Sequence, residues 1–124
     1  MNIILGIIFI GHGIAHLVGF VSPWRIMESE EMPYKTTLLN GRVNVGDVGI
    51  RVVGLLWLIA ALAFIAAGVG VIILQPWWST LALTTAIYSL ILSVLGWPDS
   101  RIGVLIDILI IVFLVLGSNL DWLP

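Results

Sequence analysis

Both histidines of the chain, His12 and His16, lie in the apolar stretch GHGIAHLVGF, residues 11–20. Residues four apart lie on the same face of an α-helix, so a helix here would present both imidazoles on one side. Two imidazoles in this arrangement can bind one metal ion, as in the zinc metalloproteases. The residue after His12 is Gly13, whereas those enzymes have a glutamate there that acts as general base. The pair therefore indicates a metal site, a ligand site or two hydrogen-bonded structural histidines.

A metal or haem site would need more than this pair. A zinc or copper ion needs a third ligand, and because the chain has no cysteine, the carboxylate expected to be buried is that of Asp107. Haem could be held through one histidine per iron. Two histidines on one helix face cannot take the opposite axial positions of a single haem. We therefore expect no cofactor, with haem, zinc or copper bound through His12 and His16 as the alternative.

Arg51 and Asp107 are charged residues inside otherwise apolar segments. A charge in the middle of a membrane helix costs about 2.5–3.5 kcal/mol even on the lenient insertion scale. Counting about 1.5 Å of rise per residue places the two side chains at similar depths. The sequence therefore predicts a structural ion pair between Arg51 and Asp107, although Arg51 is also close enough to the segment end to reach the lipid headgroups.

The same depth estimate brings polar residues from all four apolar segments into one layer, with His12 deeper, near the midplane. The ligand-binding candidates in and next to this layer are His12, His16, Tyr88 and Ser89. We expect His16 to bond Asp107, Tyr88 or Ser89, and His12 to point toward the site of any ligand. Ser89 also belongs to a stripe with Thr85 and Ser93, whose hydroxyls can bond a neighbouring helix.

The composition indicates a membrane protein. Of 124 residues, 60% are hydrophobic and 10% are charged, and the mean hydropathy is +1.18, whereas soluble domains carry about a quarter charged residues. Four segments approach or exceed the roughly 20 apolar residues that span a bilayer: residues 3–21, 48–74, 78–95 and 102–118. The first has no basic residue before it and no cleavage site after it, so we interpret it as a retained helix. The expected fold is all-α, a single domain over residues 1–124 forming an antiparallel bundle of four transmembrane helices.

The cationic residues predict the orientation of these helices. The connection at residues 22–47 contains Arg25, Lys35 and Arg42, the third connection ends in Arg101, and the second connection and both termini have none. Because lysine and arginine accumulate in cytoplasmic loops, we expect a multi-pass protein of the cell's inner (plasma) membrane with both termini extracytoplasmic.

The connections and helix faces also make predictions. The 22–47 connection is expected to lie on the cytoplasmic face, with a turn at Asn40–Gly41, and Asp47 is expected to cap the following helix. Gly11, Ala15 and Gly19 recur every fourth residue, which predicts a ridge where another helix backbone approaches closely.

With the helices assigned, the chain resembles the DoxX-like family of small four-helix bacterial membrane proteins. The resemblance lies in GHGIAHLVGF and in GWPDSRIGVLID, which places Arg101 and Asp107 on the family's turn of glycine and arginine followed by an aspartate. The charged start of the family's first helix is missing here, and the long first connection is atypical. The resemblance implies a left-handed four-helix bundle that often acts as a partner of other membrane or redox proteins.

These patterns favour a binding or accessory function over an enzyme. The chain has no GxSxG motif, no glycine-rich phosphate loop and no pair of carboxylates within the apolar segments. We expect a pocket for a small apolar ligand or a subunit of a larger membrane complex, with a haem- or metal-binding redox protein as the alternative. The partners expected are the lipid bilayer and either further copies or a larger complex. The small net charge of −2 gives no reason to expect nucleic acid.

Overall fold

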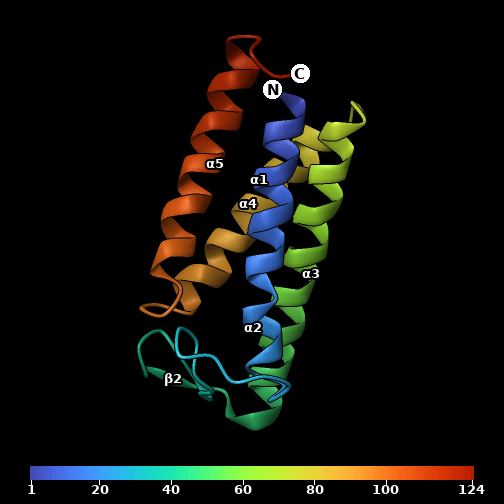
Figure 1. Ribbon diagram of the computed structural model, residues 1–124. Coiled ribbons are helices and arrows are strands. Elements are labelled where there is room, and N and C mark those ends of the chain that lie inside the picture. Colours follow the sequence, from blue (N-terminus) through green and yellow to red (C-terminus); the bar gives the residue numbers. More distant parts are fainter.

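A computed structural model describes all 124 residues, and it is all-helical apart from one short ladder of two strands (Figure 1). Four helical segments are long and apolar enough to cross a membrane. They are α1 (Asn2–His16) continued by the short α2 (Val18–Val21), α3 (Gly46–Ile72), α4 (Trp78–Leu95) and α5 (Arg101–Asn119). The prediction of four such helices is confirmed, with boundaries that match for α4 and shift by one or two residues elsewhere.

The helices pack in the order α1, α3, α4 and α5. α1 lies along α3, α3 packs on α4, and α4 packs on α5, while α1 and α5 approach each other less closely. Both chain termini lie at one end of the bundle, and the long connection between α2 and α3 lies at the other (Figure 1). α1 and α5 are therefore the two outer helices of the row.

Close contact between α1 and α3 depends on glycines. A Cβ added at Gly6 would lie 2.8 Å from the carbonyl oxygen of Gly68, and one added at Gly13 would lie 2.7 Å from that of Ala61. The predicted ridge of Gly11, Ala15 and Gly19 is wrong for its first two members, because both are exposed. The face of α1 that packs on α3 is therefore offset by about two residues from the predicted ridge. This face also carries the two histidines.

The apolar core is divided into two clusters. The larger one lies toward the termini and the smaller one toward the long connection. The larger cluster consists of Leu5, Phe9, Phe64, Ala67, Val71, Trp78, Ala82, Ala86, Ile110 and Leu114. The smaller cluster consists of Trp57, Ala60 and Leu92. Phe64 and Trp57, one from each cluster, both contact the ring of His16. A layer of buried polar side chains therefore separates the two clusters.

The connection between α2 and α3 folds back against the end of the bundle. Strands β1 (Thr37–Leu38) and β2 (Val43–Asn44) form an antiparallel ladder around the predicted turn at Asn40–Gly41. The backbone N–H of Leu39 donates to the carbonyl of Leu95 at 2.8 Å, and Lys35 forms an ion pair with Asp99 at 2.5 Å. The connection is thus tied to the α4–α5 end by backbone bonds as well as charge.

Asp47 does not cap α3 as predicted. The residue before the helix is Val45, and it makes no side-chain capping bond. Asp47 lies in the first turn, where its carboxylate accepts a hydrogen bond from the Tyr34 hydroxyl and one at 3.3 Å from Arg25. A negative charge in that position still favours the helix dipole.

Candidate functional site

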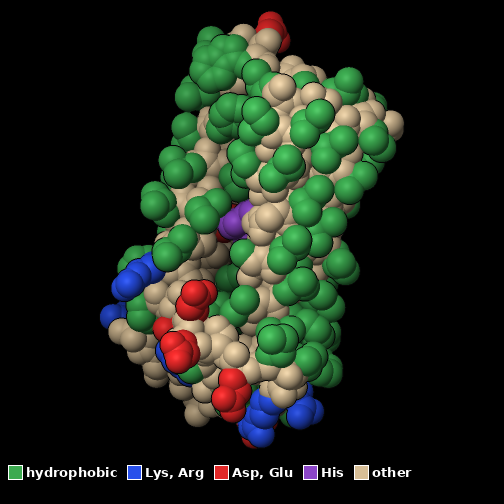
Figure 2. All heavy atoms as spheres, in the orientation of Figure 1, with side chains coloured by type: hydrophobic (Ala, Val, Ile, Leu, Met, Phe, Trp, Pro, Cys, Tyr) green, Lys and Arg blue, Asp and Glu red, His purple; other side chains and the backbone are tan.

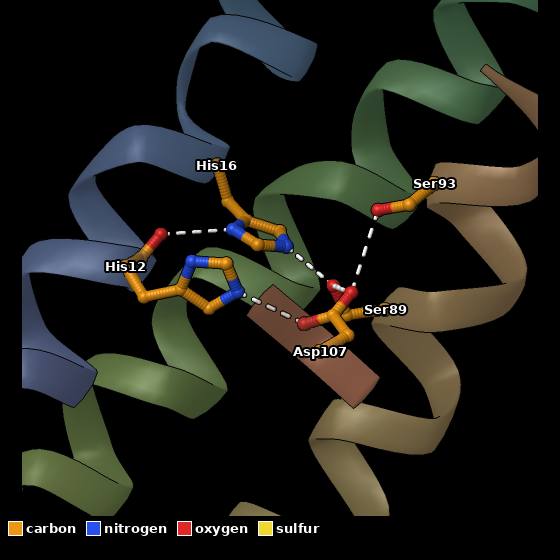
Figure 3. Close-up of polar contacts among 5 residues, drawn as sticks. All are labelled: His12, His16, Ser89, Ser93 and Asp107. Carbon is orange, nitrogen blue, oxygen red and sulfur yellow. Dashed lines mark hydrogen bonds and ion pairs between the residues drawn. The ribbon is translucent and has the colours of Figure 1, made fainter. Parts of the chain in front are cut away.

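Buried polar side chains from three helices meet between the two apolar clusters (Figure 3). His12 Nε2 lies 2.9 Å from Asp107 Oδ1, and His16 Nε2 lies 2.5 Å from Ser89 Oγ. Asp107 Oδ2 is 2.6 Å from Ser89 Oγ and 3.4 Å from Ser93 Oγ. We call these five residues the polar network. Asp107, which is fully buried at 0% exposure, is its centre.

Helix geometry explains why these residues meet. His12 and His16 are one turn apart on the face of α1 that turns toward the core, and their rings are in edge-to-face contact with centroids 4.4 Å apart. Ser89 and Ser93 are likewise one turn apart on α4. Asp107 extends from α5, so its bond to His12 directly joins the two outer helices.

The predicted ion pair between Arg51 and Asp107 is wrong. Arg51 is exposed, and its guanidinium lies 5.8 Å from the ring centre of Trp24. Asp107 is paired with His12 instead. The depth estimate could not show this, because it gives the height of a residue along its helix and not the direction in which the side chain points.

Tyr88 is not part of the polar network. Its hydroxyl donates to the backbone carbonyl of Leu56 on α3 at 2.9 Å, so the hydroxyl serves helix packing. Of the three partners expected for His16, the structure selects Ser89. The position of Tyr88 one residue before Ser89 rotates its side chain by about 100° around α4, which accounts for the different environment.

The hydrogen bonds show which ring nitrogen of His16 carries a hydrogen. Its Nδ1 lies 2.8 Å from the backbone carbonyl of His12, and since a carbonyl only accepts, Nδ1 carries the hydrogen and donates it. In a neutral ring, Nε2 is then the acceptor that faces Ser89. For His12 the assignment is reversed in the uncharged network, because Nε2 donates to Asp107 Oδ1 and Nδ1 is left as the acceptor.

The second nitrogen of His12 is the open position of the network. Every fully buried side-chain nitrogen and oxygen in the molecule has a hydrogen-bond partner, whereas His12 Nδ1 forms none, so this atom is not fully enclosed. Figure 2 shows a histidine side chain at the bottom of a hollow between α5 and α1, about midway along the bundle. His12 retains 8% exposure and His16 only 3%. We call this hollow the α1–α5 groove, and we infer that His12 borders it, because His12 is the more exposed histidine and bonds from α1 across to Asp107 on α5.

His12, His16 and Asp107 are also the residues that come closest to a metal-binding group. One ligand atom from each lies within 4.8 Å of the others. The histidine nitrogens that face Asp107 and Ser89 are already within hydrogen-bond distance of oxygen atoms, so an ion bound here would have to replace these hydrogen bonds. In this structure the three side chains are held by the hydrogen bonds of the polar network.

Sequence reasoning found most members of the network and missed their connections. His12, His16 and Ser89 were candidates for ligand binding, and Ser93 belonged to the predicted serine stripe. The bond between His12 and Asp107 was missed. The available signal was that Asp107 and the histidines are the only ionisable side chains within the apolar segments 3–21 and 102–118.

No known protein family, curated protein or solved structure matches this chain. The resemblance to the DoxX-like family therefore stays a prediction from two short motifs.

Proposed function

We propose that this protein is an integral membrane four-helix bundle that binds a small lipid-soluble molecule in the α1–α5 groove. The ligand carries an O–H or N–H group that donates a hydrogen bond to His12 Nδ1. The observation that carries the proposal is the unpartnered ring nitrogen of an otherwise buried histidine at the bottom of this groove.

The surroundings of His12 support access from the bilayer. The outer faces of α1 and α5 expose large apolar side chains, including Ile7 at 64% and Leu105 at 58%, so hydrocarbon would surround the groove. An imidazole nitrogen left without a partner in hydrocarbon is unfavourable, and a donor on a ligand would remove that cost. The ring of Phe64 lies 4.8 Å from that of His12 and provides an apolar wall.

Binding of a simple probe tests this proposal. We expect the purified protein in mild detergent to bind a phenol with an alkyl chain saturably, and the methyl ether of the same phenol about tenfold or more weakly, because the ether has no hydrogen to donate. His12→Ala should lose binding of the phenol. Tyr88→Phe is the matched control, because it removes a hydroxyl from α4 outside the polar network, and it should bind as the wild type does.

Two results would contradict the proposal. Equal affinity for the phenol and its ether, or unchanged binding by His12→Ala, would show that His12 does not receive a hydrogen bond. Near-stoichiometric zinc, copper or iron in the purified protein, or a Soret band, would instead favour the metal- or haem-binding alternative.

We further propose that the end of the bundle carrying the long connection faces the cytoplasm and that both termini lie outside it, in the inner (plasma) membrane. All five lysine and arginine residues are at or near the end that carries this connection, and positive charge accumulates on the cytoplasmic side. A reporter that is active only in the cytoplasm should work when inserted after Lys35 and fail when fused after Leu123. The reverse result would invert the topology.

A further inference from the structure

We propose that Ser89 and His16 form a proton relay through which His12 can take a proton from the bound ligand, so that the ligand is a lipid-soluble weak acid that the site ionises. This inference rests on the proposed binding of a ligand at His12. It adds a chemical class, such as a phenol or an enol, and a proton transfer that binding alone does not require.

The relay follows from counting hydrogens. His16 Nε2, Ser89 Oγ and Asp107 Oδ2 form two successive short contacts of 2.5 and 2.6 Å, and each contact needs one hydrogen between its two atoms. Ser89 has a single hydroxyl hydrogen and can supply only one of them. The second hydrogen must come either from a protonated Asp107 or from a protonated His16 Nε2.

Both arrangements have the same number of protons and the same total charge. In the first, neutral Asp107 donates to Ser89, which donates to neutral His16. In the second, His16 is an imidazolium that donates to Ser89, which donates to the Asp107 carboxylate. The two differ only by the movement of two hydrogens along the short contacts. The apolar surroundings favour the uncharged arrangement at rest.

The second arrangement makes His12 a base. When Asp107 is a carboxylate, it can take the Nε2 proton of His12 across the 2.9 Å contact at Oδ1, while His12 Nδ1 takes the proton of the ligand's O–H group. The ligand becomes an oxyanion, His12 remains neutral with its proton now on Nδ1, and Asp107 becomes neutral. The negative charge on the ligand is balanced by the positive charge on His16.

The relay ends at His16. Its other nitrogen donates to the backbone carbonyl of His12 at 2.8 Å, which cannot pass a proton on. The charge therefore stays beside the site, since the rings of His12 and His16 are 4.4 Å apart at their centroids. The charged groups that face His12 are His16 on the same helix and Asp107 on α5, while Phe64 faces it from α3. All five lysine and arginine side chains are exposed. His16 is therefore the cation that balances the charge of the ionised ligand.

A nitrophenol with an alkyl chain provides the test, because its ionised and neutral forms absorb at different wavelengths. At a pH where the probe is mostly neutral in empty detergent micelles, we expect the wild type to increase the ionised fraction of the bound probe about tenfold. Ser89→Ala and His16→Gln break the relay at different points while retaining His12. Both should still bind the probe and leave it neutral, whereas Tyr88→Phe should behave as the wild type does.

The outcomes separate this inference from the proposed function. If the wild type does not bind the probe, the proposed function fails. If the wild type binds it in the neutral form, or if Ser89→Ala and His16→Gln both ionise it as well as the wild type, binding stands and the relay is wrong. If one of the two variants does not fold, the other decides, because either one breaks the chain of contacts between His16 and Asp107.

Discussion

Replacing Asp107 with alanine should lower the free energy of unfolding by about 2–4 kcal/mol. The change leaves the donors on His12 and Ser93 without their acceptor, removes the group that donates to Ser89, and opens a cavity between α1, α4 and α5. Asp107→Asn should cost less than about 1 kcal/mol, because the amide can accept from His12 through its oxygen and donate to Ser89 through its nitrogen. Reversible unfolding in mixed micelles measures both values.

The comparison of the two variants reports the charge of Asp107. If Asp107→Asn were as destabilising as Asp107→Ala, the network would need a carboxylate at rest, and the uncharged arrangement would be wrong. Arg51→Gln provides a second control. Because Arg51 is exposed and does not contact Asp107, its replacement should change stability by less than about 0.5 kcal/mol and should add independently to the effect of Asp107→Asn.

Gly13→Ala should lower the free energy of unfolding by about 1–3 kcal/mol. The new Cβ would lie 2.7 Å from the carbonyl oxygen of Ala61 and 2.9 Å from Cγ1 of Ile65, so α1 would have to move away from α3. Such a movement would also displace His12 and His16. The measurement is again reversible unfolding, combined with binding of the alkyl phenol, and both should weaken.

Gly11→Ala is the matched control for this contact. A Cβ at Gly11 has no neighbour within 4 Å, and alanine favours a helix over glycine by roughly 0.5–1 kcal/mol. The variant should therefore be as stable as the wild type or slightly more stable. If Gly11→Ala and Gly13→Ala had equal effects, the close packing of α1 on α3 would be refuted.

The four apolar helices were predictable from the sequence because the length of a hydrophobic run, and the Pro, Gly and Trp residues that mark its ends, are local properties. The start and end of α4 were correct to the residue. The ladder of β1 and β2 was not predicted, because two residues per strand give no periodic signal. It is held by bonds to the end of α4, such as that from Leu39 to Leu95, which no local pattern reveals.

The partners of the buried charges were not predictable in the same way. Arg51 and Asp107 have similar heights, and their charges suggested a pair. Which side of α3 and α5 faces the core depends on how the helices rotate about their axes, and the apolar residues all round these helices leave that rotation undetermined. The glycine ridge failed for the same reason. Gly11 and Gly13 are both small residues in α1, and only packing against Ala61 distinguishes them.

The most direct test of a ligand site at His12 is the ¹⁵N NMR spectrum of histidine-labelled protein, recorded before and after addition of the alkyl phenol. Without the phenol, we predict that His12 carries its hydrogen on Nε2 and His16 on Nδ1, which are opposite tautomers within one helical turn. Addition of the phenol should shift the resonance of His12 Nδ1, because this nitrogen accepts the new hydrogen bond. A hydrogen on His12 Nδ1 in the free protein, or no shift of that resonance at saturating phenol, would contradict the account.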